Sequence, residues 1–336
     1  MGYYLKETGL SFTLVDGGKR VGDVWRNRYD SLRLFSPRAY SFLPGMKLLG
    51  IQDGFPTKDE LADYLENYSN HFSIPIDLNT KVEQLEKIDD QFRVKTNQGD
   101  LIANNVVIAT GPFQKPFIPE VPGEISTGIS QIHSSDYRGP HQISKGPVLV
   151  VGGGNSGLQI AAELSNTRKV YVSSGHELVF IPYRILNKSF FWWLKITGLS
   201  RVSTNAKLAK VLKKTEPIIG TESKALIDSG QLDLKGRTVS FYGKEVEFQD
   251  KTKIQVESII WATGYQFYFS WVDIPGVFDS LEKPIHQRGI SPVEGLYFLG
   301  LPWLSRVGSA QLNGIAHDAK YLSNYLKKRR SGSTGR

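Results

Sequence analysis

The chain has 336 residues, 40% of them hydrophobic, and its 41 basic residues outnumber 33 acidic ones, which gives a formal net charge of +8. This length suits two compact domains, and because no long apolar run or signal-peptide pattern is present, we expect no transmembrane segment and a cytoplasmic location. The basic residues are scattered without a stacking aromatic pattern, so we expect no nucleic-acid partner, and the absence of cysteine excludes disulfides and thiolate metal sites.

The first residues predict a dinucleotide-binding fold that is entered part-way through. Residues 2–9 have the pattern of the last turns of a helix capped by Gly9, and residues 11–15 predict a short strand that ends at Asp16. In such a fold an acid at the end of the second strand bonds the ribose hydroxyls, but Asp16 is almost as well explained as the opening of a glycine turn. A first strand and its glycine loop would precede this helix, and neither is found before it in the sequence. We therefore expect the fold to be N-terminally incomplete.

The following segment combines loops, one clear helix and a hairpin. Residues 21–34 are rich in aromatic and arginine side chains without periodicity, which predicts an ordered loop. A capping box from Thr57 to Glu60 predicts a helix, and residues 92–103 predict a hairpin. A strand that ends in Ala109-Thr110-Gly111 comes next, and four prolines then mark a linker.

The most informative pattern lies at residues 147–164. Four apolar residues predict a strand buried on both faces, and apolar residues at helical spacing follow the Gly-x-Gly-x-x-Gly sequence between them. The first glycine allows a tight turn, the second lets the backbone approach a pyrophosphate, and the third lets the helix pack close to the strand. Since strand, turn and helix follow in this order, we predict a dinucleotide site rather than a purely structural turn. Its candidate contacts are Gly152, Gly154, Asn155, Ser156 and Gly157.

The next strand indicates which nucleotide is bound. An NAD site needs an acid at the end of this strand, whereas here the strand ends in Ser173 and Ser174. Arg184 or Lys188 would supply a cation for a 2′-phosphate, although Glu177 is close enough in sequence to oppose it. The pattern therefore predicts NADPH rather than NADH.

A second strand that ends in Ala-Thr-Gly spans residues 258–265. Two such strands on either side of one glycine turn predict a domain inserted into another domain. A further strand at 295–300 and a helix within 308–328 complete the outer unit. The predicted division is 1–145 and 258–330 for the outer domain, 146–257 for the inserted domain and 331–336 for a disordered tail.

With these residues laid out, the chain resembles the flavin-containing monooxygenase-like flavoproteins, and most closely their bacterial CzcD-associated oxidoreductases, over nearly its whole length. The marks are Gly22-x-x-Trp25 with Arg28-Tyr29-Asp30, the helix that opens at 56–58, the two Ala-Thr-Gly strands, Gly152 to Gly157, Phe191–Leu194 and Gly295–Gly300. The segment around His133 departs from the monooxygenase fingerprint, because its leading aromatic residue is missing and its glycine lies one residue too far away.

The resemblance implies an α/β fold with two Rossmann-like dinucleotide-binding domains, with FAD in the outer domain and NADPH in the inserted one. It also implies that NADPH reduces the flavin and that a flavin hydroperoxide then oxygenates a small organic substrate. No catalytic side chain and no metal are expected, because the cofactor carries the chemistry. The further residues that it assigns to the cofactors are Asp16, Trp25, Arg33, Thr110, Gly111, Ala262, Thr263, Gly264 and Gly308.

Two features have competing interpretations. His133 is a candidate acid or base, but we expect a hydrogen-bonded structural histidine. The aromatic segment 190–194 is expected to pack in a core or a dimer interface, with a substrate lid second and a membrane anchor third. A homodimer is therefore a further expectation.

Three functions stay open at this point. The first is an NADPH-dependent flavin monooxygenase that uses O2 and a small substrate. The second is an NADPH-dependent flavin reductase that passes electrons to a quinone, a metal or a protein. The third is an N-terminally truncated, flavin-poor NADPH-binding remnant, which would purify without flavin.

Overall fold

The computed structural model describes residues 1–204, 206, 209 and 217–333. The α-helices are α1 (Gly2–Thr8), α2 (Asp23–Arg26), α3 (Lys58–His71), α4 (Asn155–Ser165), α5 (Phe190–Ile196), α7 (Glu222–Asp228) and α8 (Ile315–Ser333). Short 3-10 helices are η1 (Arg38–Tyr40), η2 (Pro140–Gln142) and η3 (Leu199–Arg201). The strands are β1 (Leu14–Val15), β2 (Ile76–Asp77), β3 (Val82–Ile88), β4 (Gln91–Thr96), β5 (Gly99–Ala103), β6 (Val106–Ile108), β7 (Lys115–Pro116), β8 (Gly123–Ile125), β9 (Ser130–His133), β10 (Val148–Val151), β11 (Val170–Ser173), β12 (Phe180–Ile181), β13 (Arg184–Ile185), β14 (Lys188–Ser189), β15 (Ile218–Ile219), β16 (Leu232–Lys235), β17 (Thr238–Gly243), β18 (Glu245–Phe248), β19 (Lys253–Gln255), β20 (Ser258–Trp261), β21 (Tyr265–Gln266), β22 (Val272–Asp273) and β23 (Leu296–Phe298).

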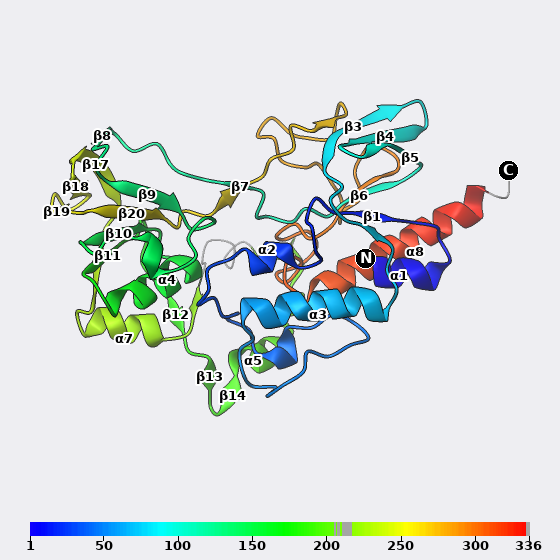
Figure 1. The fold of residues 1–336 in the computed structure, drawn as a ribbon. Helices are drawn as coiled ribbons and strands as arrows, with labels where there is room; N and C mark the ends of the chain where they lie inside the picture. The colour runs from blue at the N-terminus through cyan, green and yellow to red at the C-terminus, as the bar shows by residue number, and fades with distance from the viewer. Residues whose placement is uncertain (205, 207–208, 210–216, 334–336) are drawn as a thin grey trace.

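These elements form two lobes (Figure 1). The first lobe contains β8 to β11, β16 to β20, α4 and α7, and the second contains α1 to α3, β1 to β6, β22, β23 and α8. The lobes are connected where β7 runs antiparallel to β21, with Tyr265 opposite Pro116.

The first lobe is organised by a parallel sheet of five strands in the order β16-β11-β10-β20-β9. Alternate residues of the central strand β10 enter two different cores. Val148 and Val150 pack with the α4 side, whereas Leu149 and Val151 pack with the side formed by β17 and β18. Because both faces of β10 are covered, all four of its residues are apolar and buried.

This sheet extends across both predicted domain boundaries. β9 lies before residue 145 and forms one edge of the sheet, and β20 pairs directly with β10, with Ser258 opposite Val148. The Ala-Thr-Gly sequence at 262–264 therefore follows a strand of the glycine-turn sheet instead of opening the outer unit. The division into an outer and an inserted domain otherwise stays a prediction.

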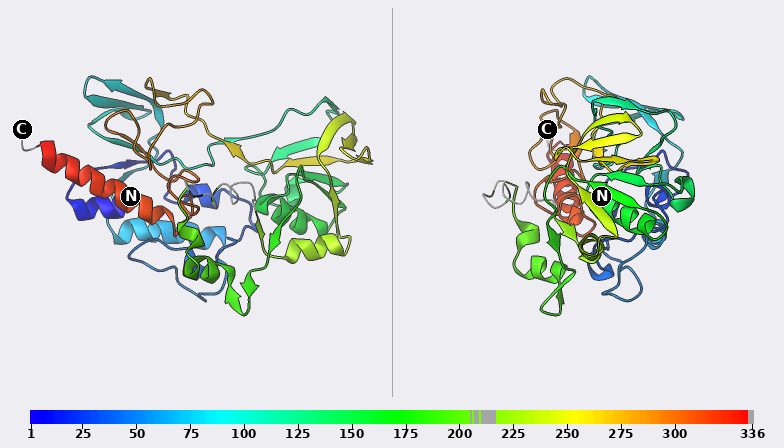
Figure 2. Two further views of the ribbon diagram at one scale, coloured as in Figure 1. Left: turned by 180° about the vertical axis from the view of Figure 1, so that it is seen from behind. Right: turned by 90° about the vertical axis from the view of Figure 1, so that its left-hand side faces the viewer.

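The second lobe packs helices against small sheets. A four-stranded sheet has the order β22-β3-β4-β5, while β6 pairs in parallel with β23 and β1 with β2. One core joins β23 to α8 through Phe298 and Leu322. α1 and α8 lie side by side at the outer edge of this lobe (Figure 2).

Local sequence patterns form the predicted elements where a cap or a turn fixes them. α1 is followed by Gly9 in the left-handed conformation at φ 70°. α3 opens with the predicted capping box, in which Thr57 accepts from the Glu60 amide and the Glu60 side chain accepts from the Thr57 amide. The predicted hairpin at 92–103 is formed by β4 and β5.

Elements without such signals differ from the prediction. The strand predicted at 11–15 is reduced to β1, and the loop predicted at 21–34 contains α2. The last helix begins only at Ile315 and continues to Ser333, which is inside the segment predicted to be disordered; residues 334–336 lie outside the described residues. None of the helices in the described ranges combines the length and the apolar character that crossing a bilayer requires.

Candidate functional site

The turn after β10 requires glycine at its first and last glycine positions. Gly152 has φ +120°, and a Cβ there would lie 2.3 Å from the carbonyl oxygen of Ala262. A Cβ at Gly157 would lie 2.0 Å from the carbonyl oxygen of Gly152. Strand, turn and helix therefore meet in direct backbone contact, for the reasons that the sequence pattern predicts.

Gly154 differs from these two because it faces open space. No neighbouring atom lies within 4 Å of the position that its Cβ would take. Gly154 is also the N-cap of α4, and no side chain caps this end in the described part of the chain. The backbone amides of Asn155 and Ser156 are thus left for an anion, at the positive end of the helix dipole. A pyrophosphate fits this open backbone, and the assignment of these residues to NADPH is a proposal developed below.

Ser173, which was predicted to face the nucleotide, is buried inside the first lobe. Its Oγ donates to the carbonyl of Gly236 at 2.9 Å and accepts from the amide of Thr238 at 3.0 Å. These bonds fasten β11 to the connection between β16 and β17. The Ser173 side chain is therefore occupied in holding the sheet together and is not free to bind a ribose.

A pocket of about 570 Å³ opens beside the next residue, Ser174. It adjoins the glycine turn, because a Cβ at Gly153 would lie 3.0 Å from Ser174 Oγ. The polar and charged side chains that line it are those of Ser174, His176, Glu177, Lys224, Asp228, Lys235, Arg237 and Gln249.

Arg237 is the pocket cation that best fits a phosphate. Lys224 pairs with Asp228 at 2.7 Å and Lys235 pairs with Asp233 at 3.1 Å. Arg237 has no carboxylate partner among the described residues, and it donates only to the carbonyl of Gly175, at 3.4 Å. Its exposed guanidinium is therefore available for an anionic ligand.

Arg184 does not line this pocket. It lies on β13, and its guanidinium pairs with Asp53 at 2.8 Å, while Lys188 follows on β14. Arg237, and not Arg184, therefore lines the pocket, since the hairpin of β13 and β14 projects at the lower edge of the molecule (Figure 1). The assignment of Arg184 to the nucleotide stays a prediction.

The second Ala-Thr-Gly loop is fixed to the linker that connects the lobes. The Ala262 amide donates to Val151 at 2.8 Å, and the Thr263 hydroxyl donates to the Phe117 carbonyl. Gly264 has φ +81°, and its carbonyl accepts from the Phe117 amide at 3.0 Å. These bonds hold the turn after β20 beside the turn after β10.

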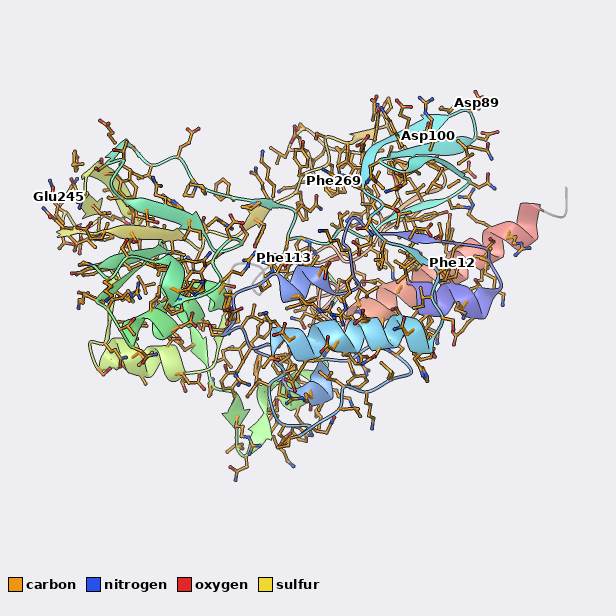
Figure 3. The ribbon with its side chains drawn as sticks, viewed as in Figure 1. Phe12, Asp89, Asp100, Phe113, Glu245 and Phe269 are labelled. Carbon is orange, nitrogen blue, oxygen red and sulfur yellow. The ribbon has the colours of Figure 1, made fainter. Side chains whose placement is uncertain are left out.

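A cation–aromatic cluster lies at the junction of the lobes. The guanidinium of Arg28 is 5.1 Å from the ring centres of both Phe113 and Tyr265, and it also donates to the Tyr265 hydroxyl. Phe113 is placed between the two lobes (Figure 3). Arg28 thus connects the α2 segment to the residue that follows the second Ala-Thr-Gly loop.

His133 supports this loop from the other side. Its Nδ1 accepts from the Ser135 amide at 3.0 Å, so Nε2 carries the proton and donates to the Gly264 carbonyl at 3.1 Å. Its ring meets Tyr265 edge-on at 5.3 Å. Burial lowers the pKa of His133, which favours the neutral ring. The expected hydrogen bonds of His133 are present, and its structural rather than catalytic role stays a prediction.

The N-terminal residues assigned to FAD have structural contacts of their own. Asp16 follows β1, and its Oδ1 accepts from the amide of Gly18 at 2.7 Å, which is the turn that the local sequence also predicts. Trp25 is partly buried in the aromatic core beside α3. Within residues 1–204, no hydrogen bond or ring contact connects the side chain of Asp16 to that of Trp25.

Arg33 and Gly308 approach other parts of the molecule. Arg33 is exposed, and its carbonyl accepts from Gln159 of α4 at 3.2 Å. Gly308 is buried, and a Cβ at Gly314 would lie 1.9 Å from its carbonyl oxygen, so the chain folds tightly on itself just before α8.

Thr110 and Gly111 provide the clearest fit to FAD. They follow β6, which pairs in parallel with β23, so the ends of both strands open at one edge. Gly111 has φ +69° with open space around its Cβ position, and Gly300 after β23 approaches it, with a Cβ there at 4.0 Å from the Gly111 Cα. The backbone at these strand ends leaves room for a flat cofactor to bind against it.

Comparison with known proteins identifies the family. A family model for pyridine nucleotide-disulphide oxidoreductases matches residues 1–180. An uncharacterized CzcO-like oxidoreductase of Geobacillus kaustophilus is 53% identical over 325 residues, which cover 96% of this chain and 93% of that protein. The chain belongs to this oxidoreductase family.

More distant matches include monooxygenases. A probable indole-3-pyruvate monooxygenase of Arabidopsis thaliana is 25% identical over 342 residues, covering 91% of this chain and 83% of that protein. The structure of a flavin-containing monooxygenase from Stenotrophomonas maltophilia matches with a TM-score of 0.82 at 23% identity, covering 98% and 94% of the two chains. The predicted α/β fold of the flavin-containing monooxygenase-like family is confirmed, and this family implies FAD and NADPH as cofactors.

Sequence reasoning missed two features of this oxidoreductase. Arg28 and Tyr265 are separated by 237 positions, so no local pattern indicates that they meet, although both stand among the marks of the resemblance. Arg237 follows a strand far along the chain from the glycine turn. Only the pairing of β16 with β11 brings it to the pocket.

Proposed function

We propose that this oxidoreductase is an NADPH-dependent, FAD-containing monooxygenase that uses O2 to oxygenate a small organic substrate. The observation that carries the proposal is the open glycine turn at the N-terminus of α4, directly beside a pocket that holds an unpaired arginine in the described part of the chain. An open helix N-terminus suits a pyrophosphate, and an arginine suits a 2′-phosphate. The cytoplasmic location and the homodimer stay predictions.

In this proposal the residues of the first lobe bind and orient NADPH. The amides of Asn155 and Ser156 would bind the pyrophosphate next to Gly154, and Ser174 would lie near the adenosine ribose. Arg237 would bind the 2′-phosphate, and no acid at the end of β11 opposes it. Glu177 also lines the pocket and limits the net positive charge there.

In the second lobe, Thr110 and Gly111 would hold FAD at the ends of β6 and β23. FAD would supply the oxygen chemistry, for which the proposal requires a flavin hydroperoxide. The junction cluster would then act by position. Arg28, through Tyr265, and His133, through the Gly264 carbonyl, would hold the loop after β20 in place. In this proposal the nicotinamide would pass this loop to reach the flavin.

The test follows the fate of oxygen on the reduced protein. The purified chain, loaded with FAD, is reduced with NADPH without oxygen and then mixed with oxygenated buffer in a stopped-flow spectrometer. A monooxygenase accumulates a long-lived hydroperoxide spectrum before the oxidised flavin returns. Direct return of oxidised flavin with release of hydrogen peroxide would instead support the reductase, and a protein that binds NADPH but no FAD would support the remnant.

A further inference from the structure

A group of exposed apolar side chains lies outside the pocket beside the glycine turn. Leu49, Ile51 and Leu186 have 85%, 79% and 82% of their surface exposed, and Ile196 has 60%. We call these four side chains, together with Ile185 of β13, the exposed patch. Large apolar side chains at such exposure are unusual when several gather in one place.

The three segments that carry the exposed patch are held together by specific contacts. Arg184 of β13 pairs with Asp53 at 2.8 Å, and Tyr183 packs on Phe55 at 4.4 Å, which joins the hairpin to the loop of Leu49 and Ile51. α5 is fixed to the same lobe because Phe191 is buried against Tyr40, with ring centres 5.7 Å apart. Packing of the aromatic segment in a core is therefore confirmed for Phe191. The hairpin and α5 lie at the lower edge in Figure 1.

The tip of the hairpin is shaped to present a leucine. Ile185 lies opposite Lys188, so Leu186 and Asn187 form a two-residue turn, and both have positive φ, at 48° and 58°. This turn favours asparagine and glycine, because a bulky side chain is strained in the left-handed conformation. Leu186 bears this strain and gains no burial within the described fold. Such an arrangement suggests that the side chain is buried by something else.

Charge indicates what covers the exposed patch. Lys47, Lys188 and Lys195 are exposed around it, and none of them pairs with a carboxylate among the described residues. The acid nearest to the hairpin, Asp53, is already neutralised by Arg184. Exposed apolar side chains with lysines beside them are typical of a segment that binds to the surface of a membrane.

We propose that the exposed patch docks this oxidoreductase on the surface of a membrane that contains anionic lipids. Leu186, Leu49 and Ile51 enter the boundary between headgroups and acyl chains, and the lysines contact lipid phosphates and carboxylates. Trp192 and Trp193 on α5 are half-buried and lie next to the hairpin, since Trp193 donates to the Ile185 carbonyl at 3.0 Å. A second copy of the chain fits less well, because a symmetric contact would bring like-charged lysines together.

The test is sedimentation of the full chain with vesicles of phosphatidylcholine alone or with added phosphatidylserine. We expect binding to the vesicles with phosphatidylserine and weakening of this binding by salt. Changing Lys47, Lys188 and Lys195 to glutamine should lower the partition coefficient about a hundredfold. Leu186→Gly should lower it about tenfold, and because glycine accepts a positive φ, the melting temperature should stay the same or rise.

A matched control is Leu281→Ser. Leu281 is 71% exposed, but it lies in the connection between β22, which pairs with β3, and β23. Its substitution should leave vesicle binding unchanged. The proposal is overturned if the parent chain, at low salt, binds vesicles with phosphatidylserine no better than vesicles without it. It is also overturned if Leu186→Gly binds vesicles as well as the parent chain does. A lipid-free dimer that Leu186→Gly dissociates would also overturn it, in favour of a second copy as the occupant.

Discussion

Replacing Arg237 with glutamine tests the assignment of the 2′-phosphate most directly. The guanidinium lines the pocket beside Ser174, and its one hydrogen bond among the described residues is to the Gly175 carbonyl. Glutamine keeps a polar side chain of similar reach but removes the charge. Since Arg237 is exposed and lies outside the buried core, the fold should be unaffected.

The size of the effect follows from the phosphate contact. A hydrogen bond to a charged group contributes about 1.5–3 kcal/mol, and each 1.4 kcal/mol corresponds to about tenfold in affinity. Because solvent screens an exposed pair, the lower end applies, so NADPH should bind about tenfold more weakly to the Arg237→Gln variant. NADH lacks the 2′-phosphate, and its affinity should not change.

Isothermal titration of the purified protein with NADPH and with NADH measures both constants without turnover. Arg184→Gln is the matched control, because Arg184 pairs with Asp53 outside the pocket and should leave both affinities unchanged. Loss of NADPH affinity in Arg184→Gln, with none in Arg237→Gln, would refute the structural assignment and restore the sequence-based one. An equal loss of NADPH and NADH affinity in Arg237→Gln would show that the residue acts on the pocket in general.

Three further predictions concern the glycine turn, the adjoining strand and the junction. Gly154→Val should weaken NADPH binding but leave FAD content and melting temperature unchanged, because its Cβ meets no protein atom. Gly157→Val should instead destabilise the fold by about 1–3 kcal/mol, because its Cβ would overlap the Gly152 carbonyl. Equal melting temperatures of the two variants would contradict this prediction. Ser173→Asp should cost at least about 3 kcal/mol in unfolding free energy, since the carboxylate would be buried where the Ser173 hydroxyl now makes its hydrogen bonds. For the same reason it should not switch the preference to NADH. Thermal melting measures the loss of stability, and titration with NADH measures the preference. The unfolded chain binds a proton at His133 more readily than the folded chain does, so the free energy of unfolding should fall as the pH drops below the ordinary histidine pKa of 6.5. Urea unfolding at several pH values should show a smaller loss of stability in His133→Gln than in the parent chain. An equal loss in both would exclude this contribution of His133.

The sequence by itself determined the parts of this oxidoreductase that depend on neighbouring residues. The change from a continuous apolar run to helical spacing, with glycines at the joint, specified β10, its turn and α4. The same is true of the capping box at Thr57 and of Gly9 after α1, because these signals act within one turn of backbone.

Tertiary structure decided the features that join distant segments. The sequence pattern indicated Ser173 for the nucleotide and gave no sign of Arg237, but the pairing of β16 with β11 buries the first and brings the second to the pocket. The sheet likewise places β20 next to β10, although the sequence pattern assigned it to the other domain. Strand order and side-chain burial arise from contacts between residues far apart in the chain, and no periodicity within a single segment encodes them.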